Sequence, residues 1–178
     1  YDSVHGVFPG DVAHDPQHLI LGGRRIKAFA MKEPSQLPWK ALGIDIVLEC
    51  TGFFLTREGA EQHLKAGAKR VVLSAPPKDN DIKTVVLGVN DHILDGTETV
   101  ISNASCTTNC AAPMLQGIHE FCGIEDGYVT TVHSFTGDQR LHDAPHKDLR
   151  RARAATVSMV PTTTGAAKAL TRIFPELD

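Results

Sequence analysis

The sequence predicts an α/β fold, made of a partial doubly wound parallel sheet followed by the start of an α+β domain. Three observations predict it. Short β-branched runs alternate with helical patterns. One helical pattern separates two of these runs at the spacing of a β-α-β crossover. The organisation of the chain changes near residue 105, where a helical segment follows the last of these runs. We therefore expect one partial domain over residues 1–105 and a second partial domain over residues 106–178.

Four runs rich in valine, isoleucine and leucine predict buried strands. They are Ile44 to Cys50, Arg70 to Ser74, Thr84 to Gly88 and Thr99 to Asn103. Between the first two runs, Thr56 can cap a helix that continues through Leu64 and ends at Gly67. A crossover of this length joins parallel strands, so we expect a parallel sheet.

The residues before this sheet predict smaller elements. The stretch HLILGGRRIKAF predicts a hairpin around Gly22 and Gly23, because glycine accepts the backbone angles of a tight turn. The stretch EPSQLPW contains Pro34 and Pro38, which favour a loop or a short helix.

The second half begins with a helical segment after Cys106, which is expected to reach Phe121 and to be closed by Gly123. Pro113 removes one N–H from this segment and can kink it, so the first residue of regular helix is left open. An extended run from Tyr128 to Phe135 follows.

Residues 136–156 are polar and rich in arginine and aspartate, and they predict a long ordered loop. Beyond this loop, Thr164 and Gly165 open a further helix in TTTGAAKAL.

The composition is that of an ordinary globular protein, with 42% hydrophobic and 22% charged residues. The net charge of −3 offers no basic excess for nucleic acid or an anionic membrane, and no run reaches transmembrane length. The four cysteines do not form a disulfide framework, which favours reduced thiols in an intracellular setting.

The chain opens on Tyr1 and stops at Asp178 without a recognisable terminus, so we expect a fragment.

Cys106 is the main candidate for chemistry, in the stretch SNASCTTNCAAP. A free thiol has a pKa of about 8.5, and a helix N-terminus or an imidazole can lower that pKa. Backbone N–H groups at a helix start, with the hydroxyls of Ser105 and Thr107, could also bind an oxyanion or a phosphate. The alternative is that Cys106 is a small buried residue at a domain junction.

His133 is the best candidate partner for Cys106, because a thiol with a histidine base suits covalent catalysis on a carbonyl. A lone histidine in a β-run is more often structural, and that alternative stays open. Cys106 and Cys110 with His119 could also be proposed as zinc ligands, but the fourth ligand has no partner motif, so we expect no metal site.

Further polar groups offer sites for anions. The TTTG stretch before a helix can bind an anion or act as a plain N-cap, and Arg150, Arg151 and Arg153 can bind phosphate or form a solvated face. CTGFF and SAPP follow strands, and therefore lie where ligands bind in doubly wound sheets, although ordinary turns explain them as well. No G-x-G-x-x-G motif occurs in the chain.

Four ordered motifs carry a family resemblance: SNASCTTNC, TTVHSFTGDQ, HKDLRRARAA and PTTTGAAKAL. Together they resemble the phosphorylating glyceraldehyde-3-phosphate dehydrogenase family, over the whole chain. The resemblance implies a Rossmann-type dinucleotide-binding domain over residues 1–105 and a catalytic domain over residues 106–178. It also implies oxidation of glyceraldehyde 3-phosphate with NAD and inorganic phosphate to 1,3-bisphosphoglycerate, in glycolysis.

The resemblance also assigns roles to residues. Cys106 would be the nucleophile, and His133 would keep it ionised and then accept the hydroxyl proton. The substrate phosphate would be held by Thr136, Asp138 and Arg153. The attacking phosphate would be held by Ser105, Thr107, Thr164 and Gly165. The dinucleotide would contact Lys32, Thr51, Gly52, Phe53 and Ser74, with Lys32 acting through its backbone because many members have arginine there.

The resemblance further implies a cytoplasmic homotetramer when full length, with residues 136–156 at a subunit interface; an organelle is not excluded. NAD is favoured over NADP because the rigid ring of Pro145, beside Ala144, would crowd a 2′-phosphate. The family's Gly-rich turn and second substrate arginine have no counterpart here, so this chain alone is expected to be inactive. Three alternatives stay open: an erythrose-4-phosphate dehydrogenase, a Cys/His thiol hydrolase, and a non-catalytic fragment or binding module.

Overall fold

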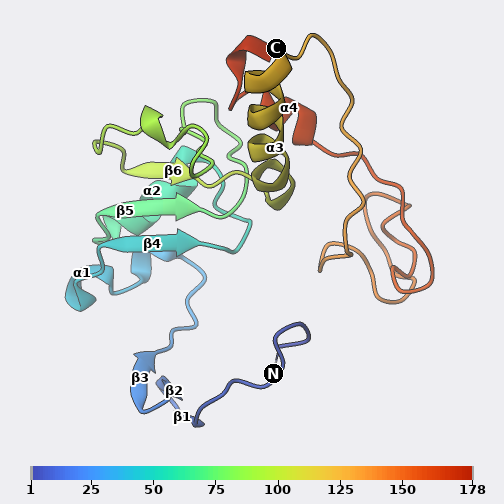
Figure 1. Cartoon of the computed structure of the whole chain (residues 1–178). Helices are drawn as coiled ribbons and strands as arrows, with labels where there is room; N and C mark the ends of the chain where they lie inside the picture. The colour runs from blue at the N-terminus through green and yellow to red at the C-terminus, as the bar shows by residue number, and fades with distance from the viewer. Residues whose placement is uncertain (1, 178) are drawn as a thin grey trace.

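A parallel sheet of three strands lies at the centre of the chain, in a computed structural model that describes residues 2–177. The strands β4 (Ile46–Glu49), β5 (Arg70–Leu73) and β6 (Val100–Ser102) pair in that order, with Val71 opposite both Val47 and Val100. The helix α2 (Arg57–Lys65) crosses from β4 to β5 and covers one face of the sheet (Figure 1). The predicted α/β class and parallel sheet are confirmed.

The crossover helix forms as its sequence predicts. The Thr56 hydroxyl accepts a hydrogen bond from the N–H of Gly59 and so satisfies one of the free donors of the first turn. Ala60 of α2 packs against Val71 and Leu73 of β5, and all three are fully buried. After the helix, Gly67 adopts a φ of 107°, which an L-residue rarely adopts.

An antiparallel sheet precedes the parallel sheet and lies apart from it (Figure 1). It contains β1 (Val12–Asp15), β2 (His18–Leu21) and β3 (Arg24–Lys27). Gly22 and Gly23 form the predicted hairpin turn, and both have positive φ, as a two-residue turn requires. The sequence did not predict β1, because its four residues are mostly exposed and have no alternating apolar pattern. The short helices η1 (Pro34–Gln36) and α1 (Trp39–Leu42) follow.

One predicted strand does not form, and one predicted extended run has no partner strand. In Thr84 to Gly88, only Thr84 pairs with Ser102, in a single parallel bridge. The Asn90 side chain accepts from the N–H of Val86 and donates to the carbonyl of Thr84, and thereby replaces the next ladder bonds. The run from Tyr128 to Phe135 is extended but unpaired, because no strand lies beside it within residues 2–177.

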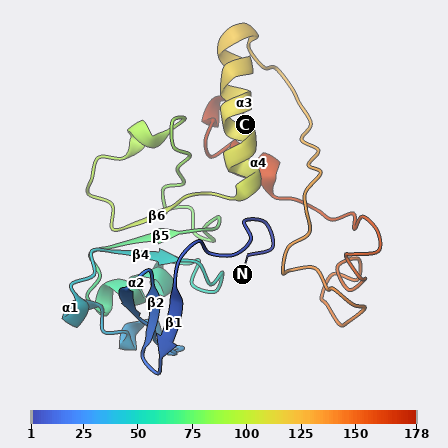
Figure 2. The same cartoon turned by 60° about the horizontal axis from the view of Figure 1, so that its bottom comes forward.

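The second half is built on α3 (Cys106–Cys122), which begins at the N-cap Ser105 and ends at Gly123. Pro113 lies inside this helix without ending it. The short helix α4 (Ala166–Leu170) packs beside α3, and a long excursion, residues 124–165, leaves one helix and returns to the other (Figure 2). The remaining elements are the short helices η2 (Asp91–Ile93) and η3 (Pro175–Leu177).

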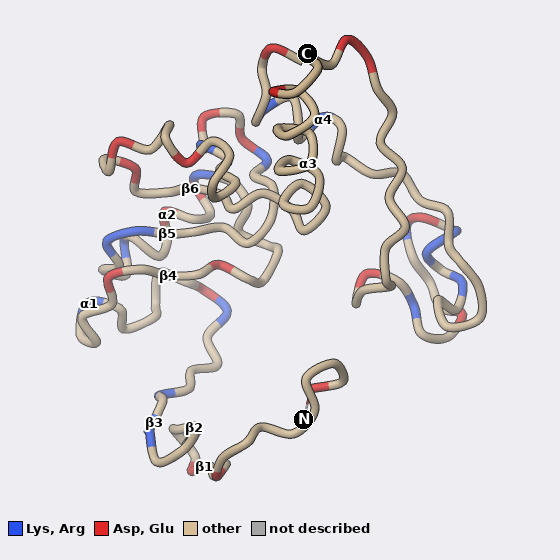
Figure 3. Tube along the Cα trace, viewed as in Figure 1, with Lys and Arg blue, Asp and Glu red and all other residues tan. Residues whose placement is uncertain are grey.

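A second apolar cluster joins α3 and α4 to the segment after β5. Val86, Ala112, Leu170 and Phe174 are buried together in this cluster. Charged residues of both signs are spread along the rest of the chain, whereas α3 has almost none (Figure 3). Over residues 2–177, no helix has both the length and the apolar character needed to span a bilayer.

We predict that Gly67→Ala destabilises the fold far more than Gly96→Ala. Both glycines have positive φ, which costs an alanine about 1 kcal/mol. Only at Gly67 would an added Cβ lie 2.4 Å from the Cβ of Lys40 and 2.7 Å from its Cα, whereas Gly96 faces open space. The clash should add roughly 1–3 kcal/mol of destabilisation. Denaturant midpoints of the two variants provide the measurement, and equal midpoints would contradict the packing of α1 on the end of α2.

Candidate active site

Cys106 is the first residue of α3, and three neighbours place it there. Ala104 has a φ of 59°, which is uncommon for a residue other than glycine, and this conformation turns the chain from β6 into the helix. The Ser105 hydroxyl accepts from the N–H of Thr108 at 3.0 Å and pairs with the Thr108 hydroxyl at 2.7 Å. Cys106 is left exposed at the start of a 17-residue helix.

His133 lies against the thiol. The distance from Cys106 Sγ to His133 Nε2 is 3.2 Å, and His133 Nδ1 lies 2.7 Å from the backbone oxygen of Ser134. A carbonyl oxygen only accepts, so Nδ1 carries a proton and Nε2 faces the sulfur. Both side chains line one open cavity of about 450 Å³.

The electrostatics of this pair favour charge separation. The hydrogen bond from His133 is the largest cause that lowers the pKa of the Cys106 thiol; partial burial acts next and raises it, and contacts with Thr107 lower it further. The Ser134 carbonyl raises the pKa of His133, and so does the neighbouring sulfur of Cys106. Thiolate and imidazolium therefore stabilise each other, and this pairing makes a cysteine nucleophilic at neutral pH.

A second cavity, of about 360 Å³, gathers the four residues assigned to the attacking phosphate. Its lining includes Ser105, Thr107, Thr164 and Gly165, although they come from segments about 60 residues apart in sequence. Thr107 lines both this cavity and the thiol cavity, so the two are adjacent. The Ser105 hydroxyl is already engaged as the helix cap, which leaves the two threonines as the freer donors.

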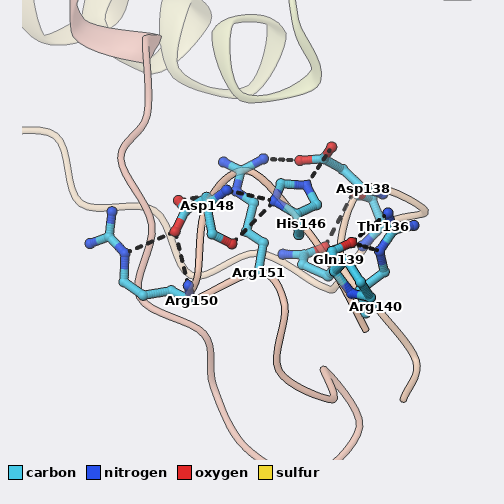
Figure 4. Close-up of polar contacts among 9 residues, drawn as sticks. Thr136, Asp138, Gln139, Arg140, His146, Asp148, Arg150 and Arg151 are labelled. Carbon is cyan, nitrogen blue, oxygen red and sulfur yellow. Dashed lines mark hydrogen bonds and ion pairs between the residues drawn. The ribbon is translucent and has the colours of Figure 1, made fainter. Parts of the chain in front are cut away.

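The residues assigned to the substrate phosphate are only partly brought together. Thr136 and Asp138 share one turn of the long loop, where Asp138 is paired with Arg151 and lies 3.6 Å from His146 (Figure 4). Arg153 instead pairs with Asp143 at 3.1 Å.

The residues assigned to the cofactor lie mainly at one edge of the parallel sheet. Thr51, Gly52 and Phe53 follow β4, and Ser74 follows the neighbouring strand β5. Gly52 has a φ of 75° with no atom where a Cβ would lie, and the Phe53 ring is exposed, so this edge has room for a flat ligand. Lys32 is exposed in the segment after β3, and no hydrogen bond within the described residues ties it to this edge.

No group of three or more histidine, cysteine, aspartate or glutamate side chains converges as a metal site within residues 2–177. Cys106, Cys110 and His119 accordingly do not form such a group.

Comparison with known proteins identifies the family. Residues 1–57 match the model of the NAD binding domain of glyceraldehyde 3-phosphate dehydrogenase, and residues 105–178 match the model of its C-terminal domain. The chain belongs to the glyceraldehyde-3-phosphate dehydrogenase family. The resemblance predicted from the four motifs is therefore confirmed, as is the Rossmann-type class of the parallel sheet.

Relatives named glyceraldehyde-3-phosphate dehydrogenase are similar over almost the whole chain. The protein of Thermotoga maritima is 58% identical over 170 residues, which are 96% of this chain and 51% of the relative. Those of Clostridium acetobutylicum and Geobacillus stearothermophilus are 55% and 54% identical, each over 99% of this chain and 53% of the relative. The chain thus spans about half the length of the curated relatives it matches.

The sequence did not predict three residues that line the second cavity. Lys168 and Arg172 line it together with Thr84, whose hydroxyl is buried and has no hydrogen-bond partner among residues 2–177. The spacing of four residues between Lys168 and Arg172, just after TTTG, was a usable signal, because residues four apart share one side of a helical segment. Nothing in the sequence marked Thr84, which was assigned to a strand.

We predict that His133→Asn shifts the pH profile of Cys106 alkylation to higher pH. The hydrogen bond from His133 is the main cause of the lowered thiol pKa, so its loss leaves less thiolate at neutral pH. The measurement is the iodoacetamide labelling rate at each cysteine against pH, read by mass spectrometry. Labelling of Cys110, exposed on the same helix, is the internal control and should keep its profile. An unshifted Cys106 profile would show that this contact does not control the thiol.

Proposed function

We propose that the full-length protein oxidises glyceraldehyde 3-phosphate, with NAD and inorganic phosphate, to 1,3-bisphosphoglycerate. One observation carries the proposal: a thiol 3.2 Å from an imidazole lines a cavity that shares Thr107 with a second, hydroxyl-lined cavity. A nucleophile beside an anion site is what an acyl transfer to phosphate requires. The family and the names of the relatives support the same reaction.

Covalent addition is the first step. The Cys106 thiolate bonds to the aldehyde carbon, the carbonyl electrons move to oxygen, and that oxygen takes the proton from His133 Nε2 to become a hydroxyl, which leaves His133 neutral. His133 then takes the hydroxyl proton while a hydride leaves the carbon; NAD, when bound, supplies the acceptor for this hydride. A phosphate oxygen attacks the resulting thioester, and Cys106 leaves as thiolate.

Two anion sites serve the two phosphates in this proposal. Thr107 and Thr164 donate to the attacking phosphate, and Lys168 and Arg172 supply positive charge on the same cavity. Thr136 and Arg153 hold the substrate phosphate after Arg153 exchanges its bond to Asp143. Asp138 acts through Arg151, because a carboxylate would repel the phosphate directly.

NAD would bind along the carboxyl edge of the parallel sheet. Thr51, Gly52, Phe53 and Ser74 contact it there, and Lys32 contributes its backbone. In this proposal, residues 1–105 are a partial dinucleotide-binding domain. Residues 106–178 are a partial catalytic domain. The loop over residues 136–156 lies at a subunit interface of a homotetramer, and the cytoplasm is the expected location.

The other functions considered have less support. Relatives at about 55% identity are named for glyceraldehyde 3-phosphate, which does not favour an erythrose 4-phosphate enzyme. A thiol hydrolase would have no use for an NAD binding domain, which residues 1–57 match. The inactivity of this chain by itself stays a prediction.

We predict that Thr164→Val in the full-length protein raises the KM for phosphate, whereas Thr163→Val does not. Thr164 lines the second cavity, and its neighbour Thr163 is exposed outside it. Loss of one hydrogen-bond donor to the anion should raise the KM for phosphate roughly tenfold. The assay is NAD reduction dependent on both glyceraldehyde 3-phosphate and phosphate, with Cys106→Ser as the inactive control. Turnover by Cys106→Ser, or turnover without phosphate, would refute the proposed reaction.

We also predict that the full-length protein uses NAD better than NADP and that Pro145→Ser narrows the difference. The serine removes a rigid ring that would crowd the 2′-phosphate, while keeping the backbone oxygen that accepts from Arg140. Steady-state kcat/KM values with both cofactors provide the measurement. A lower preference for NAD in the unsubstituted protein than in Pro145→Ser would contradict the assignment.

A further inference from the structure

Two buried side chains and a half-buried indole form a hydrogen-bonded chain outside the thiol site. Glu49 ends β4 and is 2% exposed, and His63 lies on α2 and is 4% exposed. His63 Nε2 lies 2.9 Å from Glu49 Oε2, and the indole N–H of Trp39 donates to His63 Nδ1 at 3.1 Å. A buried carboxylate and imidazole are costly unless each polar atom is satisfied, and here every one is.

The indole fixes the tautomer of the histidine. A tryptophan N–H only donates, so His63 Nδ1 must accept and cannot carry a proton. The proton therefore lies on Nε2 and is donated to Glu49. The Trp39 ring also stacks on the imidazole, with centroids 6.3 Å apart, so the orientation of His63 is set together with its tautomer.

The other carboxylate oxygen of Glu49 holds the turn after β4. Glu49 Oε1 accepts from the backbone N–H of Thr51 at 2.7 Å and also from the Thr51 hydroxyl. The Thr51 oxygen in turn accepts from the N–H of Phe53 at 3.2 Å. The chain of bonds thus runs from Trp39 to the turn that carries Thr51, Gly52 and Phe53.

The remote end of this chain is itself anchored. The N–H of Lys40, beside Trp39, donates to the carbonyl of Ala66 at 3.0 Å, and Gly67 allows the close approach of these segments. Trp39 is therefore held against α2, and its N–H has a defined position relative to His63.

We propose that His63 is a positioning residue for the cofactor turn, which it orients through Glu49 while the Trp39 indole holds it in the Nε2–H tautomer. This inference rests on the proposed function, because the turn is a cofactor site only if NAD binds there. Glu49 must be an acceptor toward both His63 and Thr51. A side chain at position 49 that presents a donor to His63 or to Thr51 would break this series of hydrogen bonds.

Glu49→Gln provides the test in the full-length protein. The amide oxygen can face Thr51, but its NH₂ then meets the Nε2–H of His63, and shifting that proton to Nδ1 sets it against the Trp39 N–H. NAD affinity should fall roughly tenfold, since a buried donor is left unsatisfied. The kcat and the KM for glyceraldehyde 3-phosphate should change by less than about twofold, because the thiol site does not share these contacts.

Trp39→Phe is expected to rescue Glu49→Gln. Without the indole N–H, His63 can carry its proton on Nδ1 and accept at Nε2 from the introduced amide, so the double variant should regain most of the lost NAD affinity. A packing role alone predicts that the two losses add. Glu98→Gln is the matched control, because it removes a carboxylate paired with Lys83 away from the turn and should leave NAD affinity unchanged.

The outcomes separate the two proposals. An unsubstituted protein that binds NAD, with Glu49→Gln binding it equally well or the double variant binding it worse, overturns the positioning role and leaves the proposed function standing. Failure of the unsubstituted protein to bind NAD overturns both. The tautomer is measured independently by long-range ¹H–¹⁵N NMR of histidine-labelled protein, with the signal assigned by its loss in His63→Gln. A proton on Nε2 supports the inference, and a proton on Nδ1 overturns it.

Discussion

The contact between Cys106 and His133 is the interaction on which the functional account depends, and the start of α3 makes it possible. The left-handed backbone at Ala104 and the cap formed by Ser105 fix the first turn of the helix, with the thiol exposed at its end. The extended segment after α3 then brings His133 to within 3.2 Å of the sulfur. Each group stabilises the charged form of the other, so neither would have its chemistry without the other.

The rest of the molecule places a second cavity beside this pair, because Thr107 lines both cavities. Parallel pairing of β4 and β5 brings the turns after both strands to the same edge. Arg172, beyond α4, donates to Asn80 at 2.7 Å in the loop after β5 and also lines the cavity beside Thr107. Arg172 thereby ties the half with the sheet to the half with α3 and α4 beside this second cavity. A reaction that joins cofactor, thiol and phosphate needs this proximity.

Local patterns predicted much of this architecture. The capped helix after Thr56, the hairpin at Gly22 and Gly23 and the start of α3 follow from side-chain chemistry that acts over a few residues. The strand predicted at residues 84–88 does not form because the Asn90 side chain competes for its backbone bonds. The run at residues 128–135 is extended as predicted, but no strand lies beside it within the described residues. Thr84, Lys168 and Arg172 meet in one cavity through tertiary packing, which a single sequence does not reveal. The motifs nevertheless pointed to the family and to Cys106.

The ionisation of the Cys106 thiol decides whether the proposed chemistry has a nucleophile at neutral pH. A titration of the full-length protein, followed by the ultraviolet absorbance of thiolate and corrected with a Cys106→Ser sample, isolates the step that belongs to Cys106. We expect this step to lie clearly below the ordinary thiol pKa of about 8.5. A step at or above that value would mean that the imidazole does not ionise the thiol, and the proposed chemistry would lose its nucleophile.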